Sequence, residues 1–260
     1  PDFGKQKGQW NSKQFLNDNP VVLELGCGRG EYTNGLAKIF TDKNFIGVDI
    51  KGDRLAAAGV VAQRENLNNV AYLRIMMQFI DDFCEENEVD EIWLTFPDPR
   101  PKDRDEKKRL THPHFLNKYK KVLKPDGILH LKTDSAPFFD YSMDSLPANK
   151  FEIIASTNDL YESTWNKDHF GIKTRFEKIF YEKGFPITGT ESIGSDALLF
   201  HMGTVDQNGV LKTQGGRVLA VTTYGHTIAE AVQQAQTELG KIQFEGKYHR
   251  RDIGFEFPDA

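Results

Sequence analysis

Residues 21–32, VVLELGCGRGEY, decide the fold of this chain. The first five, VVLEL, form a short apolar and β-branched run, which is typical of a strand buried in a parallel sheet. Glycine then stands at Gly26, Gly28 and Gly30, and a helical stretch follows over residues 31–40. Glycine permits a tight turn and lets the backbone come close to a ligand. The stretch therefore predicts a buried strand, a ligand-binding turn and a helix.

The alternation of strands and helices continues through most of the chain. Further strands are predicted at 45–50, 71–75, 91–96, 127–133 and 151–156, and further helices at 52–66, 79–86 and 112–123. A helix between successive strands brings the strands side by side in parallel and covers both faces of the sheet. We therefore predict an α/β fold with a doubly wound, mainly parallel, Rossmann-like sheet.

The pattern changes near residue 184. Strand-like runs beyond this point are bounded by Asn-Gly and Gly-Gly turns, which are typical of antiparallel hairpins. One amphipathic helix follows at 227–239, with Thr227 as its N-cap. We therefore expect a boundary at about 180–190 and two domains, an α/β domain over 1–184 and a small β-rich α+β module over 185–260.

The composition indicates a globular protein without a membrane-spanning segment. Hydrophobic residues make up 38% and charged residues 27% of the chain, and no apolar run approaches the roughly 20 residues that a bilayer span needs. The N-terminal residues lack the apolar core of a signal peptide. The two cysteines, Cys27 and Cys84, provide no disulfide framework. The expected location is therefore the reducing cytoplasm.

Net charge and histidine spacing bear on two classes of ligand, nucleic acids and metal ions. The net charge of −5 argues against a generally basic nucleic-acid binder but leaves room for a local basic patch. The histidines at 112, 114, 130 and 169 lack the spacing of metal ligands, so we expect no metal site.

Two acidic residues flank the glycine turn in a way that suits a nucleoside ligand. Asp49 ends the second predicted strand, where a carboxylate can accept hydrogen bonds from a ribose diol. Glu24 lies just before the glycines, close to where a cationic group of the ligand would sit. The spacing G-x-G-x-G, rather than G-x-G-x-x-G, favours S-adenosylmethionine over a dinucleotide. The alternative is an ordinary Rossmann-like turn in which the acid is structural.

A charged segment, residues 98–109, follows the fourth predicted strand. In an open α/β sheet, ligands bind beyond the carboxyl ends of the strands, so Asp98 is expected at the ligand edge. Prolines at 97, 99 and 101 restrict the backbone around it. The segment also carries six basic residues: Arg100, Lys102, Arg104, Lys107, Lys108 and Arg109. Charge alone leaves two interpretations open, a solvated salt-bridged loop or an arm that contacts phosphates.

Seven motifs occur in one order along residues 8–184: LELGCGRGEY, FIGVDIK, NVAYL, IWLTFPDPRPK, KKRLTHPHFL, HLKTD and GIKTRFE. Together they resemble the bacterial tRNA (guanine-N7-)-methyltransferase family. The resemblance implies a methyltransferase domain that uses S-adenosylmethionine and binds tRNA. It implies that Glu24 and Asp49 hold the cofactor, and that Asp98 is the active-site acid beside the cofactor and the target guanine. The substrate-binding positions that it implies are Lys102, Asp134, Thr174, Arg175, Phe176 and Glu177, and the tRNA-contacting segment is Arg104–Arg109.

One position departs from the family pattern. The family usually has an acid after the third strand, where this chain has Gln78. An amide can still accept a hydrogen bond from the adenine amino group, so Gln78 is expected to contact the cofactor and to affect affinity more than chemistry. The chemistry needs no general base, because guanine N7 carries a lone pair and no proton. Asp98 is then the natural acceptor for the guanine N1 and N2 hydrogens, which fixes the base for methyl transfer.

The last part of the chain resembles a different enzyme. YEKGFPITG, LLFHMGT, QGGRVLAVTTYG and YHRRDIGFEF lie within residues 181–260. They resemble the C-terminal part of glycinamide ribonucleotide synthetase, which is phosphoribosylamine–glycine ligase. That enzyme needs an ATP-grasp core, of which the sequence shows no sign, so ligase activity is expected to be absent. The chain is a natural fusion, a chimera, or a methyltransferase whose tail mimics the other family. Both families can carry E-K-G-x-P-I near the junction, which favours a chimera.

Three functions therefore compete. The leading hypothesis is an S-adenosylmethionine-dependent tRNA methyltransferase. The second is a tRNA-binding protein whose catalysis has lapsed, for which Gln78 is the motive. The third is a ligase fragment from purine biosynthesis, which only the tail supports. The oligomeric state stays open.

Overall fold

The computed structural model describes residues 6–174, 177, 184–214, 217–251 and 253–254. Contacts within the chain divide it into two compact units, residues 1–172 and 173–260, and each unit is described by itself. Residues 178–183, next to the boundary expected at 180–190, lie outside the described residues. The assignment of domains to 1–184 and 185–260 therefore stays a prediction.

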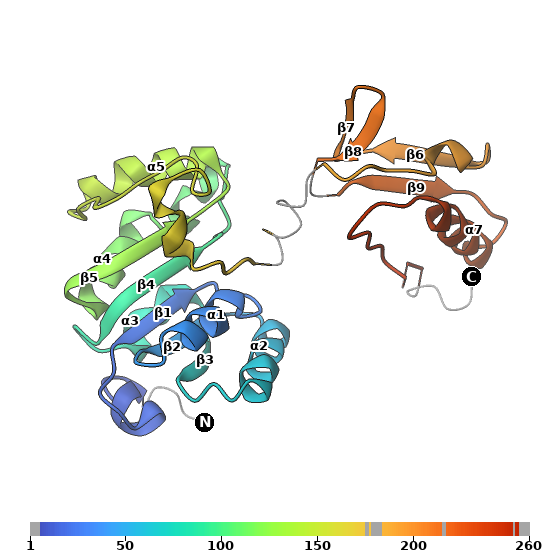
Figure 1. The fold of residues 1–260 in the computed structure, drawn as a ribbon. Coiled ribbons are helices and arrows are strands. Elements are labelled where there is room, and N and C mark those ends of the chain that lie inside the picture. The colour runs from blue at the N-terminus through green and yellow to red at the C-terminus, as the bar shows by residue number, and fades with distance from the viewer. Residues whose placement is uncertain (1–5, 175–176, 178–183, 215–216, 252, 255–260) are drawn as a thin grey trace. The chain divides into compact units, whose positions relative to one another are not determined.

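A five-stranded parallel sheet forms the centre of the first unit (Figure 1). Its strands are β1 (Val21–Leu25), β2 (Asn44–Asp49), β3 (Val70–Arg74), β4 (Val89–Thr95) and β5 (Leu123–Lys132). They lie in the order β3-β2-β1-β4-β5, and every adjacent pair is parallel. The chain runs outward from β1 to β3 on one side and from β4 to β5 on the other. The predicted doubly wound sheet is confirmed, and its switch point lies between β1 and β4.

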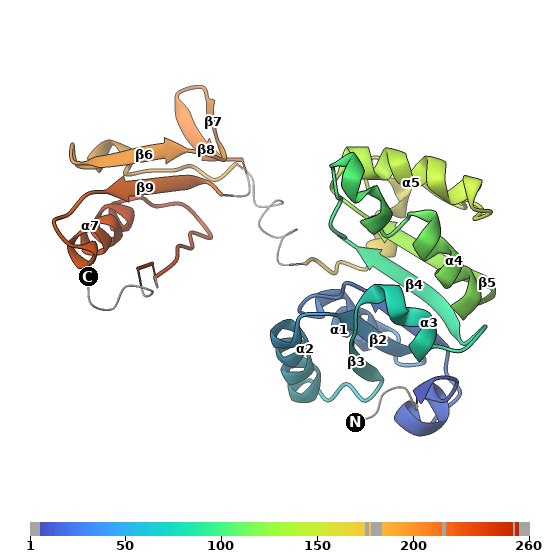
Figure 2. The same cartoon turned by 180° about the vertical axis from the view of Figure 1, so that it is seen from behind.

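Helices cover both faces of this sheet. They are α1 (Glu31–Ile39), α2 (Gly52–Arg64), α3 (Ile80–Phe83), α4 (Pro113–Val122) and α5 (Ala136–Ala148). Shorter helices of 3₁₀ or π type lie at Trp10–Phe15, Met77–Phe79, Asp103–Lys108 and Thr164–His169. The two opposite views place α1 and α2 on one face and α3 and α4 on the other (Figures 1 and 2).

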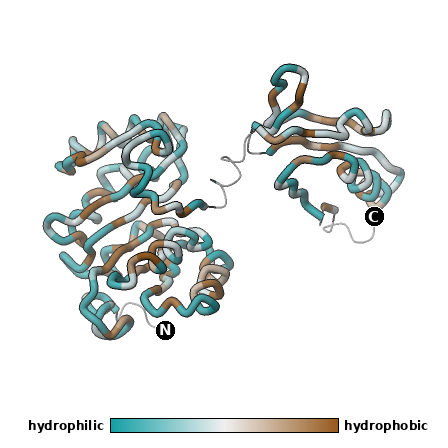
Figure 3. The backbone as a smooth tube through the Cα atoms, in the orientation of Figure 1, coloured by the Kyte–Doolittle hydropathy of each residue, from teal (hydrophilic) through white to brown (hydrophobic). Residues whose placement is uncertain are grey.

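The burial pattern of β1 follows from this layering. All five of its residues are buried. Leu23 belongs to the apolar core that includes Leu116 of α4, and Val22 belongs to the core that includes Leu36 of α1. Strands that are buried on both faces need apolar residues at nearly every position. Apolar segments accordingly recur along the strands of the first unit in Figure 3.

The predicted helix at 79–86 is shorter than expected. A 3₁₀ turn at Met77–Phe79 leads into α3, which ends at Phe83. The Trp10 indole Nε1 donates a hydrogen bond to the Phe83 carbonyl at 2.8 Å, and Cys84 has extended backbone angles of φ −120° and ψ 140°. A continuing helix would need that carbonyl for its own backbone ladder. The buried Trp10, far away in sequence, thus contacts the chain at the point where the helix ends.

The predicted strand at 151–156 is wrong. Residues 151–157 carry no helix or strand, and Ile154 is 76% exposed. A strand is stable only against a partner backbone, and among the described residues β5 pairs with β4 alone. The apolar alternation of FEIIAS suits a strand, but this segment pairs with no strand among the described residues.

The second unit contains two small antiparallel sheets. β6 (Ala197–His201) pairs with β9 (Leu219–Thr223), and β7 (Thr204–Gln207) pairs with β8 (Val210–Thr213). The Asn208-Gly209 turn of the second hairpin has φ angles of 56° and 78°, as a type I′ turn requires. The Gly215-Gly216 turn lies outside the described residues. The expected antiparallel, β-rich organisation is confirmed.

One helix, α7 (Ile228–Lys241), completes this unit. The Thr227 side chain accepts a hydrogen bond from the Glu230 backbone N–H at 3.2 Å, so the expected N-cap is confirmed. A 3₁₀ turn at Thr190–Ser192 precedes β6. Across the described residues of both units, every helix is too short or too polar to traverse a bilayer.

Candidate functional site

The predicted cofactor residues lie at the carboxyl ends of adjacent strands in the first unit. Glu24 is next to last in β1, and Asp49 is the last residue of β2. Thr95 ends β4 and Lys132 ends β5, on the other side of the switch point. Parallel strands bring these ends to one edge of the sheet, which is where open α/β sheets bind their ligands.

The glycine turn between β1 and α1 requires glycine for two separate reasons. Gly26, Gly28 and Gly30 have φ angles of 84°, 55° and 72°, which residues with a Cβ atom rarely adopt. Nothing lies within 4 Å of the position that a Cβ atom on Gly28 would take, so the turn is open on that side. A Cβ atom on Gly30 would instead overlap the Tyr72 hydroxyl. The middle glycine leaves room for a ligand, and the last one allows close packing of helix and sheet.

Asp49 fixes the shape of this turn. One carboxylate oxygen accepts a hydrogen bond from the Gly28 backbone N–H at 3.0 Å, and the other accepts from the Lys51 N–H at 2.8 Å. A carboxylate has about four acceptor sites. Asp49 can therefore hold the turn and still accept from a ligand hydroxyl.

Glu24 is buried, with 5% of its surface exposed. Its Oε2 accepts from the Thr33 backbone N–H at 2.7 Å and from the Thr33 hydroxyl, and its Oε1 accepts from the Thr95 hydroxyl. Burial raises the pKa of Glu24 to about 7, against the opposing effect of these hydrogen bonds. Sequence analysis missed both threonines, although Thr95 stands at the end of a predicted strand and Thr33 at the start of a predicted helix.

Gln78 lies in the 3₁₀ turn after β3 and is exposed. Its neighbour Met77 packs against the apolar core and has its sulfur 3.9 Å from the position of a Cβ atom on Gly26. The turn after β3 thus borders the glycine turn.

Asp98 lies in the loop that follows β4. The loop is tied to the sheet by the Phe96 N–H, which donates to the Lys132 carbonyl at 2.7 Å. The Asp98 side chain is 60% exposed and forms an ion pair with the Arg100 guanidinium at 3.2 Å. Its Oδ1 also accepts from the Arg100 backbone N–H at 3.2 Å. The candidate catalytic acid is therefore held by the adjacent arginine and is accessible to a substrate.

The basic segment forms a 3₁₀ helix at Asp103–Lys108. The Lys108 ammonium is paired with Asp105 at 2.6 Å. Arg109 donates from Nε to the Arg100 carbonyl at 3.2 Å and lies over the Tyr141 ring at 4.4 Å. The other three predicted contacts are exposed, and their side chains make no hydrogen bond or ion pair with the described residues: Lys102, Arg104 and Lys107. The segment is thus a partly salt-bridged loop with three outward cations.

Lys132 is a residue of this edge that sequence analysis did not single out. Its ammonium donates to the Tyr32 hydroxyl at 2.7 Å and lies over the Phe96 and Tyr161 rings at 5.3 and 5.7 Å. Asp134, predicted to bind substrate, is exposed two residues further along. The sequence signal was the motif HLKTD, which contains both residues.

The predicted T-x-x-E run is described in part. The Thr174 N–H donates to Glu177 Oε2 at 2.8 Å, and the Glu177 N–H donates to the Thr174 hydroxyl at 3.1 Å. This reciprocal pair has the hydrogen-bond pattern of a capping box. Arg175 and Phe176 lie outside the described residues. Thr174 and Glu177 fall in the second unit, so they are not assigned a place at the edge described above.

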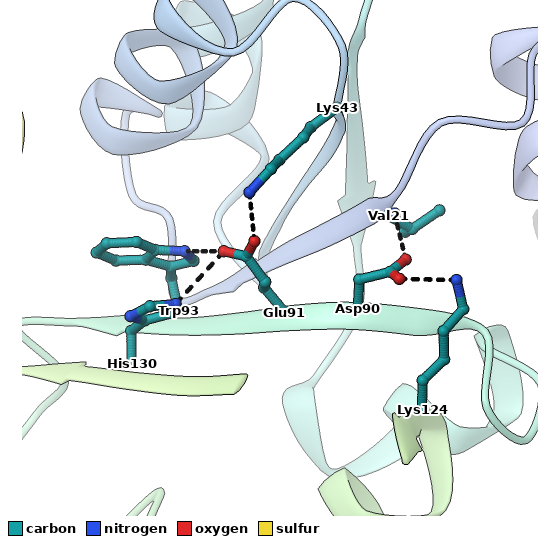
Figure 4. Close-up of polar contacts among 7 residues, drawn as sticks. All are labelled: Val21, Lys43, Asp90, Glu91, Trp93, Lys124 and His130. Carbon is teal, nitrogen blue, oxygen red and sulfur yellow. Dashed lines mark hydrogen bonds and ion pairs between the residues drawn. The ribbon is translucent and has the colours of Figure 1, made fainter. Parts of the chain in front are cut away.

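A separate polar cluster is formed by side chains of β4 and β5 together with Lys43, which directly precedes β2. Lys43, Trp93 and His130 converge on Glu91 (Figure 4), with Lys43 Nζ at 2.5 Å from its carboxylate. His130 Nε2 lies 3.4 Å from the same group, and the His130 and Trp93 rings stack with centroids 4.0 Å apart. These side chains line a cavity of about 200 Å³, and no predicted site residue does so.

Comparison with known proteins identifies two families along the chain. The family described as "Putative methyltransferase" matches residues 18–190, and "Phosphoribosylglycinamide synthetase, C domain" matches residues 180–256. The two matches overlap at 180–190, where the sequence predicted a boundary.

Individual relatives give the first family a more specific name. A tRNA (guanine-N(7)-)-methyltransferase of Christiangramia forsetii is 48% identical over 183 residues, covering 70% of this chain and 82% of the relative. The enzyme of the same name from Bacteroides thetaiotaomicron is 48% identical over 181 residues, covering 70% and 71%. The one from Clostridioides difficile is 37% identical over 191 residues, covering 74% and 87%. By these matches the chain belongs to the tRNA (guanine-N(7)-)-methyltransferase family.

Proposed function

We propose that this protein transfers a methyl group from S-adenosylmethionine to N7 of a guanine in tRNA. The observation that carries the proposal is the 48% identity to a relative of that name over 70% of the chain. The carboxyl edge of the sheet supports it, because this edge collects the glycine turn, two carboxylates and the Asp98 loop. Such an enzyme would work in the cytoplasm, where tRNA is found.

The residues at this edge suit the cofactor. Open space at Gly28 allows the backbone to approach an adenosine, Asp49 has acceptor capacity for ribose hydroxyls, and Glu24 offers a carboxylate for a cationic group. Gln78, on the turn beside Gly26, would accept from an adenine amino group through its amide oxygen. The cofactor supplies an electrophilic methyl group on a sulfonium centre. The protein chain has to bind the two substrates and orient them for the transfer.

The chain's main task is to orient the guanine. N7 carries a lone pair and no proton, so no residue has to remove a proton from it. Asp98 accepts from the guanine N1 and N2 hydrogens and fixes the base, which lowers the barrier through positioning. Arg100 holds the Asp98 carboxylate within the loop before the base arrives.

The outward cations of the basic segment contact tRNA phosphates. Lys102, Arg104 and Lys107 are exposed and suit this role, whereas Lys108 is paired with Asp105. Arg109 has a different task, because its guanidinium holds the loop against Tyr141. Phosphate contacts of this kind position the nucleic acid and do not read its sequence.

A single-turnover assay tests the proposal. The full chain is mixed with radiolabelled S-adenosylmethionine and an unmodified tRNA transcript, and the product is analysed for 7-methylguanosine. The matched control is the same transcript with 7-deazaguanosine in place of guanosine, which lacks the acceptor nitrogen. We expect methylation of the first transcript only. Equal methylation of both, or of neither, would contradict the proposal.

The exposed Gln78 leaves one alternative, a tRNA-binding protein whose catalysis has lapsed. It predicts tRNA binding without methylation in the same assay. For the second unit, we propose that the match to a synthetase C domain records a join of two families near 180–190. A ligase assay with phosphoribosylamine, glycine and ATP should show no activity.

A further inference from the structure

Glu24 connects three elements of the first unit at the cofactor edge. It stands near the end of β1, Thr33 lies in the first turn of α1, and Thr95 ends β4. All three side chains are buried, with 5%, 1% and 6% of their surfaces exposed. Thr33 donates hydrogen bonds to Glu24 Oε2 from both its backbone N–H and its hydroxyl, whereas the Thr95 hydroxyl donates to Oε1. Among the described hydrogen bonds, the one that Glu24 Oε1 accepts therefore comes from Thr95.

The two hydroxyls allow Glu24 to exist in either protonation state without a lost hydrogen bond. A hydroxyl can both donate and accept, while a backbone N–H can only donate. When Glu24 is ionised, both threonine hydroxyls donate to it. When Glu24 is protonated on Oε1, its own O–H donates to the Thr95 hydroxyl. A buried acid whose own oxygens stay hydrogen-bonded in both states can change its charge at a lower cost.

The groups around Glu24 disfavour a negative charge on its carboxyl group. Glu31 on α1 and Asp49 on β2 are acidic, and Cys27 in the glycine turn and Tyr72 on β3 also face this region. Burial raises the pKa of the Cys27 thiol and of the Tyr72 hydroxyl, so both stay neutral. On β5, the Lys132 ammonium is bound to the Tyr32 hydroxyl. A cationic ligand beside Glu24 would stabilise the ionised carboxylate and lower its pKa.

We propose that cofactor binding expels a proton from Glu24, and that Thr95 is the positioning residue that makes this exchange possible. The inference rests on the proposed function, since it takes S-adenosylmethionine as the ligand. Without the cofactor, Glu24 is protonated and its O–H donates to Thr95. With the cationic cofactor in place, the proton leaves to the buffer, and the Thr95 hydroxyl rotates to donate to the carboxylate.

Calorimetric titration of the full chain with S-adenosylmethionine tests the exchange. Titrations at pH 5.5 and 7, each in buffers with different ionisation enthalpies, give the affinity and the number of protons released. One proton released below the pKa implies an affinity that rises on the order of tenfold over this range. We expect that rise together with a release approaching one proton at pH 5.5.

Three variants assign the exchange to these residues. Glu24→Gln keeps the side-chain shape but cannot ionise, so the pH dependence and the proton release should vanish. Thr95→Val removes the hydroxyl, so the affinity at pH 7 should fall and the rise should move to higher pH. Thr95→Ser restores the hydroxyl and should restore the wild-type profile. Thermal unfolding of each variant checks that it is folded.

The outcomes separate the inference from the proposed function. Absence of S-adenosylmethionine binding at every pH would overturn the proposed function and the inference with it. Binding with a flat pH profile and no proton release would overturn the inference alone. A wild-type profile in Thr95→Val would overturn the role of Thr95. The wild-type proton release decides the central point even if a variant fails to fold.

Discussion

At the scale of single residues, the buried Glu24 and the partly buried Glu91 show how neighbouring groups set the charge of a carboxyl. Burial raises the pKa of Glu24 to about 7, since its partners are hydroxyls and one backbone N–H. Burial would also raise the pKa of Glu91, but contacts with His130 and Lys43 lower it to about 2. The same residue type thus has a raised pKa where hydroxyls and a backbone N–H surround it, and a lowered pKa where a lysine and a histidine do.

Replacing Glu91 by glutamine should destabilise the protein in a pH-dependent way. The folded-state pKa lies below the unfolded value of 4.5, so the stabilisation is complete above about pH 4.5 and is lost as the pH falls towards 2. At pH 6, we expect a loss of about 2 kcal/mol in the free energy of unfolding. Urea unfolding at several pH values measures this, with the exposed Glu152→Gln as control. A difference that does not shrink at low pH would contradict it.

Replacing Asp98 by alanine should abolish methyl transfer while leaving cofactor binding intact. Asp98 is accessible and makes its described contacts to Arg100, not to the glycine turn. Loss of base orientation should lower the single-turnover rate by about 100-fold or more. Calorimetry with S-adenosylmethionine and a rapid-quench methylation assay give the two readouts. The exposed Asp140→Ala on α5 is the matched control, and equal turnover in both variants would count against the role.

At the scale of elements, the basic segment divides into cations that hold the loop and cations that point outward. Charge density alone did not reveal the division, because Arg109 and Lys107 are two residues apart in one run. Their surroundings differ: Arg109 lies over Tyr141 and binds the Arg100 carbonyl, whereas Lys107 is exposed.

Alanine substitutions at these two positions should therefore have different effects. Arg109→Ala should lower the free energy of unfolding by about 1 kcal/mol, through the lost stacking and hydrogen bond. Lys107→Ala should leave the unfolding midpoint unchanged but reduce the salt slope of tRNA binding by about one. Thermal unfolding and filter binding at several salt concentrations separate the two. An unchanged slope in Lys107→Ala would remove that residue from the tRNA contact.

At the scale of the whole molecule, the cofactor edge is contained in one unit. The glycine turn, Asp49, the Asp98 loop and both apolar cores of the sheet all lie within residues 1–172. The second unit has its own strands and helix, and its buried apolar residues among those described are Ile187 and Ile242. The cofactor edge therefore does not draw its described residues from the second unit.

A fragment of residues 1–184 should bind S-adenosylmethionine with nearly the affinity of the full chain. The fragment keeps every residue of the edge and the run Thr174–Glu177. Calorimetry on both proteins measures the affinity, and circular dichroism checks the fold of the fragment. Loss of binding in a folded fragment would show that the second unit contributes to the site.

Much of the first unit was predictable because its signals are local. The five strands of the sheet, the glycine turn and the N-cap of α7 follow from short patterns of apolar, small and capping residues. The contact at the end of α3 was not predictable, since it comes from Trp10, about seventy positions away. The absence of a strand at 151–156 was not predictable either, because strand formation depends on pairing, and this segment pairs with no strand among the described residues.

The sequence by itself determined the parallel sheet, the glycine turn and the family, because periodicity and motifs are properties of neighbouring residues. Only the tertiary structure decided how individual charges are used. It places the Thr33 and Thr95 hydroxyls on Glu24, pairs Asp98 with Arg100, and holds Arg109 against Tyr141. Burial and hydrogen bonding set the charge of a side chain, and both arise when elements distant in sequence pack together.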